Sequence, residues 1–321
     1  MAFEFCSNES LATGLRRVMR ERLDKALAAL DDATPEQLAE VVHGSRKEFK
    51  RLRALLRLAR PALGRKRFAH ENRVLREAGR ALSAVRDSQV LGAAFTQLLE
   101  TAPGRIPAAT VAGVRRGLTR HVEAVKRVTA LEERVPPVLT DLRHLRERMP
   151  RWSLSSATTD DHADTADWEP AIGAGLCQSY RQARLALALV EKEGGTLDAP
   201  WHELRKRVKD VGYQLRLFRP VWRRELKARV RALDAVAAAL GDDHDLLVLR
   251  DLLQMPKEPW AAPEELHGVT ALIEERRAKL QRKALKNARR LFLEKPARFT
   301  AQLCGYWQIW QGGKVESKTS P

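Results

Sequence analysis

One segment occurs twice in this 321-residue chain, and it limits the possible folds more than any other feature. The first copy reads HGSRKEFKRLRALLRLARP, from His43 to Pro61, and the second reads HELRKRVKDVGYQLRLFRP, from His202 to Pro220. In register, the copies match in their apolar residues at helical spacing as well as in their cations. The repeat therefore favours two related helical units.

Each copy carries a row of cations at steps of four and three residues. On a helix, this spacing stacks the side chains along one side. The rows consist of Arg46, Lys50, Arg53, Arg57 and Arg60 in the first copy, and of Arg205, Lys209, Arg216 and Arg219 in the second. Gly212 interrupts the second row.

The rows are predicted to line a groove. Each row position follows an apolar position by one residue, which is about 100° of helical rotation, so the cations border the buried stripe instead of lying opposite it. Like charges at i,i+4 destabilise a helix by roughly 0.2–0.5 kcal/mol per pair. Nevertheless, Glu48 is the only acid within the first row and Asp210 the only one within the second. We expect a partner outside the helix to supply the negative charge.

Composition narrows the class of protein. A net charge of +17 and a pI near 10.3 indicate a polyanionic partner, namely nucleic acid, an anionic membrane surface or an inorganic phosphate polymer. The three cysteines form no Cys-x-x-Cys pair, which predicts neither a disulfide framework nor a zinc site. With no secretory signal and no long apolar run, we expect a cytoplasmic protein without membrane insertion.

The expected fold is all-α, with two pseudo-symmetric helical bundles around a central basic groove or pore. The predicted divisions are residues 1–150 for the first bundle, 151–169 for a linker, 170–311 for the second bundle and 312–321 for a flexible tail. The linker is rich in Ser, Thr and Asp, which is typical of a partly disordered segment. An alternative is that this acidic linker folds back over the basic groove as an autoinhibitor.

Helix boundaries follow from the apolar periodicity and from Pro and Gly. In the first half we expect helices over 9–31, from a capping box at Thr34–Gln37 to Pro61, and over 65–83, 87–101, 108–134 and from Pro136-Pro137 to Met149. In the second half we expect helices over 170–193, from about 198 to Pro220, and over 222–240, 244–254, 264–293 and 296–310.

Several short motifs carry a resemblance to a known family. In the first half they are Val42-His43, Arg46, Lys50-Arg51-Leu52-Arg53, Leu56-Arg57, Val85-Arg86-Asp87 and Val90-Leu91. In the second half they are His202, Leu204-Arg205, Lys209, Tyr213, Leu240-Gly241, Asp245, Val248-Leu249 and the ending from Lys295 to Trp310. With these motifs, the chain resembles the CHAD (conserved histidine alpha-helical domain) family from end to end.

The resemblance implies that the basic helices bind inorganic polyphosphate and that the protein is associated with polyphosphate granules. It implies no cofactor. A Glu-x-Glu-x-Lys motif, found in the triphosphatase domain that often accompanies this family, is absent from the chain, so no enzymatic activity is carried over. The family usually has Arg before the tyrosine, where this chain has Gly212. That difference weakens the anion binding expected of the second row, and Arg216 can compensate for the missing arginine.

Arginine and lysine suit a polyphosphate site, because Arg binds phosphate oxygens in bidentate fashion and Lys supplies a mobile point charge. The histidine of each copy can donate to phosphate, or it can be a partly buried residue that caps its neighbours. The candidate ligands are His43, Arg46, Lys47, Lys50, Arg51, Arg53, Arg57, Arg60, His202, Arg205, Lys206, Lys209, Arg216 and Arg219.

Two other functions fit parts of the sequence. A nonspecific nucleic-acid-binding protein would use the same cations, with Trp201, Tyr213, Phe218 and Trp222 as base-stacking residues or as aromatic core. The segment Gly241–Asp245 has His and Asp, as metal-dependent phosphohydrolases do. A helix start, with Asp as a cap or salt-bridge partner, is the favoured interpretation of that segment.

Overall fold

The computed structural model describes residues 3–34, 36–154, 170–193, 195, 197–255, 260 and 263–312, without the side chains of 84–87, 263 and 264. Within these residues the chain is all-α, as expected, with no strand. The expected linker from 155 onward and the tail after 312 lie outside the described residues. The helices are α1 (Leu11–Asp31), α2 (Leu38–Ala81), α3 (Ala84–Glu100), α4 (Ala108–Thr129), α5 (Leu131–Arg148), α6 (Pro170–Lys192), α7 (Asp198–Leu217), α8 (Arg223–Leu253), α9 (Pro263–Leu291) and α10 (Pro296–Gly312), with a short 3-10 turn at Met149–Arg151.

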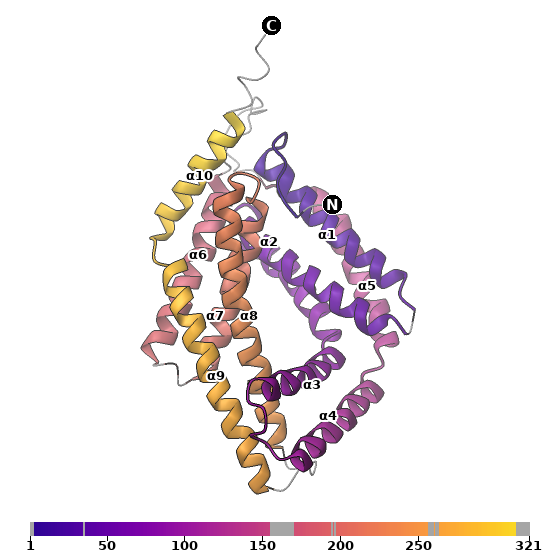
Figure 1. The fold of residues 1–321 in the computed structure, drawn as a ribbon. Helices are drawn as coiled ribbons and strands as arrows, with labels where there is room; N and C mark the ends of the chain where they lie inside the picture. Colours follow the sequence, from indigo (N-terminus) through magenta and orange to yellow (C-terminus); the bar gives the residue numbers. More distant parts are fainter. Residues whose placement is uncertain are drawn as a thin grey trace.

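The helices pack around one shared core. In the first half, α1, α2 and α5 pack together, and in the second half α7 packs between α6 and α8, with α9 along α8 (Figure 1). The halves are joined by α2, which packs against both α6 and α7. Buried apolar side chains form one cluster that includes Phe5 near one end of the chain and Trp307 near the other. The division into two bundles, the pseudo-symmetry and the central groove stay predictions.

Helix α2 reverses direction at Gly64, whose φ of 74° lies outside the helical region and favours glycine. Across this reversal, Arg53 Nε donates to Asn72 Oδ1 at 3.0 Å, and Arg46 Nη1 donates to the Ser83 carbonyl at 3.0 Å. The part before Gly64 is called α2N and the part after it α2C. The predicted end of the helix at Pro61 is too early, because Pro61 lies inside α2N. A proline removes only one backbone donor, whereas the backbone of Gly64 leaves the helical conformation.

Four other predicted boundaries are also wrong. No capping box forms at Thr34–Gln37: Gln37 N donates to the Thr34 carbonyl within a turn, and α2 begins at Leu38 without a side-chain cap. The expected break at 86–87 lies within α3, which begins at Ala84. The chain breaks at Ala130, whose φ is 39°, and not at 136–137, because the two prolines remove bonds only near the start of α5.

The fourth difference is at Gly241, which lies in the middle of one continuous helix, α8. A glycine weakens a helix by about 1 kcal/mol. This is too little to end a helix that is packed between α7 and α9. The segment after Gly241 is therefore not a helix start.

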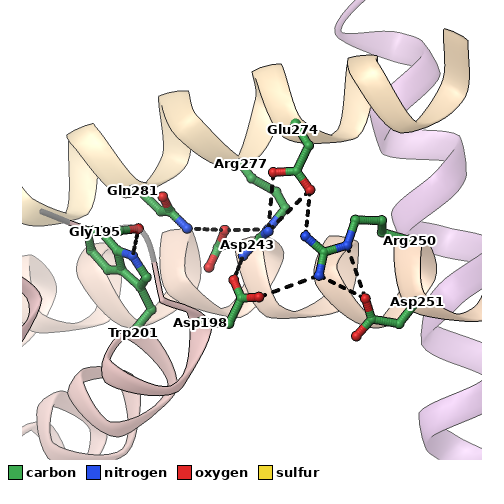
Figure 2. A network of polar contacts seen from close by, with 9 residues as sticks. All are labelled: Gly195, Asp198, Trp201, Asp243, Arg250, Asp251, Glu274, Arg277 and Gln281. Carbon is green, nitrogen blue, oxygen red and sulfur yellow. Dashed lines mark hydrogen bonds and ion pairs between the residues drawn. The ribbon is translucent and has the colours of Figure 1, made fainter. Parts of the chain in front are cut away.

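A network of ion pairs, centred on the buried pair Arg277–Asp243, holds α9 against α7 and α8 (Figure 2). The side chain of Arg277 is 5% exposed, and it contacts Asp243 at 3.0 Å, Glu274 at 3.3 Å and also Asp198. Arg250 extends the network to Glu274 at 2.8 Å and to Asp198 at 3.4 Å. Burial raises the pKa of Asp243 to about 6, although Arg277 opposes the shift. Asp243 is therefore a salt-bridge partner inside α8, whereas the helix start favoured for this segment is wrong.

Candidate anion-binding site

The two cation rows lie on helices that contact each other. The first row is on α2N, the second is on α7 and just beyond its end, and α2 packs directly against α7. The apolar stripes beside the rows are buried, as Phe49 in α2N and Val208 in α7 illustrate. The cations therefore lie beside buried apolar stripes on two helices that contact each other. That the two rows line a groove stays a prediction.

Lys209 of α7 lies in a crowded positive environment. Its pKa is lowered to about 8, first because the side chain is buried and then because Arg205 and Lys50 are nearby cations. Asp245 only partly opposes this shift. Lys50 comes from α2N and Lys209 from α7, so cations of both rows act on one another. Within the described part of the chain, Lys209 makes no ion pair.

Arg53 of α2N is the second such cation. Its pKa is lowered to about 10 by burial and then by the positive charge of Arg57, with smaller contributions from Arg76 and Arg80. Asp210 partly opposes this shift. Arg53 donates a hydrogen bond to Asn72 and makes no ion pair among the residues described. We define the cationic cluster as Lys50, Arg53, Arg57, Arg76, Arg80, Arg205 and Lys209.

Arg76 and Arg80 were not predicted as site residues. They lie on α2C, and the reversal at Gly64 returns them to the neighbourhood of Arg53. A signal exists in the sequence, because Arg73, Arg76 and Arg80 follow one another at steps of three and four. The sequence does not reveal that these residues fold back beside the first row.

Asp210 supplies part of the negative charge from inside the protein. The Nη1 atom of Arg57 donates to Asp210 Oδ1 at 3.1 Å, which links α2N to α7. Arg207 Nη1 lies 3.7 Å from the other carboxylate oxygen. Asp210 is only 7% exposed, and burial raises its pKa against the effect of the arginines. Arg57 is therefore partly neutralised without any external partner.

Other candidate ligands also have partners within the protein. Gly212 is buried, and a Cβ there would meet Leu233 of α8 at an ordinary contact distance of 3.7 Å, so the second row has a gap at this position. Arg216, expected to compensate, pairs with Asp234. The remaining contacts are Arg51 with Glu48 at 2.7 Å, Lys206 with Glu203 at 2.5 Å, Arg219 with Glu4, Arg60 over the Phe68 ring at 5.1 Å, and Arg46 with the Ser83 carbonyl, while Lys47 is exposed.

His202 is half-buried beside a second histidine. Its ring centroid lies 4.7 Å from that of His244, and its pKa is lowered to about 4, first by burial and then by His244 and by the cations Lys206 and Arg205. His202 is therefore neutral at pH 7. Its Nδ1 atom is buried and has no hydrogen-bond partner among the described residues. His43 is also half-buried, in α2N.

The described residues contain no group of three or more His, Cys, Asp or Glu side chains placed to hold a metal ion. The His202–His244 contact therefore stays a pair of imidazoles at the edge of the cationic cluster. In the same part of the chain, no helix combines the length and apolar character that crossing a bilayer requires.

Comparison with known proteins identifies the fold and the family. A family model for the CHAD domain matches residues 17–254, which include both cation rows. The chain belongs to the CHAD family. This membership is consistent with polyphosphate binding. Helices α9 and α10 lie outside the matched range.

Solved structures show the same CHAD fold at low sequence identity. The crystal structure of the CHAD domain from the plant Ricinus communis has a TM-score of 0.59 and 20% identity, covering 91% of this chain and 93% of its own. PptA from Streptomyces chartreusis has a TM-score of 0.55 and 18% identity, covering 94% of this chain and 100% of its own. No curated protein matches this chain in sequence.

Proposed function

We propose that this CHAD protein binds inorganic polyphosphate through the cationic cluster. The observation that carries the proposal is the state of Lys209 and Arg53, two partly buried cations on different helices with lowered pKa values. Neither has an ion-pair partner within the described residues, so an anion in this position would relieve an existing repulsion. The proposed role is binding without catalysis, in the cytoplasm and at polyphosphate granules.

The chemistry of polyphosphate suits such a cluster. The polymer carries about one negative charge per phosphoryl unit and has no base to be recognised. A binding site therefore needs closely spaced cations, and mixed arginine and lysine supply both bidentate and mobile contacts. By analogy with nucleic acids, most of the affinity should come from counterion release and should fall steeply with salt.

The aromatic residues favour polyphosphate over nucleic acid. Two of the residues considered for base stacking belong to the core, because Trp201 is 4% exposed and Phe218 is fully buried. Tyr213 lies beneath the guanidinium of Arg216, at 5.4 Å from its ring centroid. Nonspecific single-strand binding depends on aromatic rings that are free to stack on bases. Three of the four candidate rings therefore offer no such surface. The fourth, Trp222, is 46% exposed and packs edge-on against Tyr306.

The proposal is tested by reversing two charges in the cluster. Lys50→Glu with Arg53→Glu should weaken binding of long-chain polyphosphate by about 100-fold or more, because two charge-assisted contacts worth roughly 1.5–3 kcal/mol each are lost. The control is Arg116→Glu with Arg298→Glu, which changes the net charge equally at exposed positions on α4 and α10. Circular dichroism checks that both variants fold. Equal affinity loss in the two double variants would refute the assignment of the cluster.

A further inference from the structure

A polar pocket of about 310 Å³ adjoins the cationic cluster on the side of α6. Arg57 and Arg60 of α2N and Arg207 of α7 line it, together with polar side chains from α2C and α6 such as Ser179 and Gln182. Arg57 belongs both to this pocket and to the cluster. A chain lying along the cluster could therefore enter the pocket without leaving its row of cations.

The pocket contains one acid among its arginines. Asp210 Oδ1 accepts a hydrogen bond from Arg57, whereas Oδ2 is buried and accepts none from any residue that the structure describes. Arg207 Nη1 lies 3.7 Å from Oδ2, which is beyond hydrogen-bond distance. A buried acceptor without a hydrogen bond is costly, typically by about 1–3 kcal/mol. A ligand that brings a donor to this oxygen would remove that cost.

The other polar groups of the pocket are mostly donors: three guanidiniums, the Ser179 hydroxyl, and the amides of Asn72, Gln178 and Gln182, which can donate as well as accept. Each guanidinium can donate to phosphate oxygens but cannot accept. Ser179 Oγ accepts a hydrogen bond from Gln214 Nε2 at 2.9 Å, which leaves its own hydroxyl proton for a ligand. The pocket thus combines several donors with one buried carboxylate oxygen that has no hydrogen bond among the described residues. This set matches a tetrahedral phosphate group that has several unprotonated oxygens and one O–H.

Only the end of a polyphosphate chain has that form. An interior phosphate has two unesterified oxygens that share one charge and carry no proton at neutral pH. A terminal phosphate has a further ionisable oxygen, which resembles the second ionisation of a phosphate monoester, with a pKa of about 6. Its O–H can donate to a carboxylate, whereas an interior phosphate would place a charged oxygen against that carboxylate.

We propose that this pocket holds the terminal phosphate of a polyphosphate chain, with Asp210 Oδ2 accepting the hydrogen bond of its P–O–H group. The interior of the chain then lies along the cationic cluster. The inference rests on the proposed function and adds a preference for chain ends over chain interiors. Asp210 is thereby a specificity residue, besides its structural link to Arg57.

Linear tripolyphosphate and cyclic trimetaphosphate test the proposal, because the cyclic compound has no ends. Affinities are measured by calorimetry at one pH and one ionic strength for the wild type and for Asp210→Asn. The wild type should prefer the linear compound by about tenfold or more. In Asp210→Asn the ratio of the affinity for the linear compound to that for the cyclic compound should fall severalfold. The affinity for the cyclic compound itself should be unchanged or higher, because a negative charge has been removed. An equal change for both compounds would mean that Asp210 acts only through its charge, which overturns the proposal.

A second variant covers the case in which Asp210→Asn does not fold. Arg207→Gln removes one pocket donor and keeps the hydrogen bond between Arg57 and Asp210. It should weaken binding of the linear compound more than binding of the cyclic one. Orthophosphate that binds as tightly as tripolyphosphate would make the pocket a site for free phosphate and would also overturn the proposal. If long-chain polyphosphate binds but neither variant changes the ratio, only the end pocket is refuted. If long-chain polyphosphate does not bind at all, the proposed function itself fails.

Discussion

Polyphosphate binding should be linked to proton uptake by Lys209. This lysine has a pKa of about 8 in the free protein, below its ordinary value of 10.5, because of burial and nearby cations. A polyanion at the cluster favours the charged form and should restore the pKa toward its ordinary value. Binding then takes up a proton wherever the free protein holds the neutral amine.

The size of the effect follows from these two values. At pH 9 roughly nine-tenths of the free protein would have Lys209 neutral, whereas almost all of the complex would keep it charged, so affinity should fall about tenfold between pH 7 and pH 9. Stability should show the opposite trend. The unfolded chain binds the proton more tightly between pH 8 and 10.5, so the contribution of Lys209 to the stability of the free protein rises with pH in that range.

Isothermal calorimetry in two buffers with different ionisation enthalpies measures the proton uptake directly. At pH 9 we expect close to one additional proton per binding event in the wild type compared with Lys209→Arg, whose guanidinium stays charged at this pH. Tripolyphosphate is unsuitable here because it titrates itself, so long chains with few ends are used. Identical proton uptake and identical pH dependence in the two proteins would refute the reasoning.

Three further predictions concern the fold and the histidine. Arg277→Met leaves Asp243 buried without its guanidinium and should cost about 3–5 kcal/mol in urea unfolding, without changing polyphosphate affinity; a loss below 1 kcal/mol would contradict the buried network. Gly175→Ala should lower the free energy of unfolding by about 1–3 kcal/mol or more, because the new Cβ would lie 1.9 Å from the carbonyl oxygen of Leu58 in α2. The control is Gly79→Ala, which has open space around the new Cβ and should be neutral or stabilising. Polyphosphate should raise the pKa of His202 from about 4, seen by NMR titration, and an unchanged value would place the anion elsewhere.

The sequence predicted the parts of the structure that depend on local periodicity. Apolar spacing identified α2N and α7 as amphipathic helices, and the offset of each cation from the apolar stripe placed the rows beside the buried contact. The all-α class followed from the same patterns. Local signals failed where tertiary packing decides, as at Gly241, which lies in the middle of α8 because neighbouring helices stabilise it.

Pairing between distant residues could not be predicted. Asp210 and Arg57 are far apart in sequence, and nothing in either segment indicates that this carboxylate faces this guanidinium. The same holds for Arg216, whose counter-ion is Asp234 on the next helix. The row of the second copy therefore has fewer unpaired cations than its sequence suggested, while the reversal of α2 adds Arg76 and Arg80 to the first.

The central claim is that the cationic cluster, in which Lys209 and Arg53 make no ion pair among the described residues, binds polyphosphate. A salt series tests it most directly. Affinities for long-chain polyphosphate and for single-stranded DNA are measured at matched phosphate concentration from low to physiological salt. We expect steep salt dependence for both ligands, a large preference for polyphosphate at every salt concentration, and loss of that preference in Lys50→Glu with Arg53→Glu. Equal affinity for the two polymers, or a preference that survives this double variant, would contradict the account.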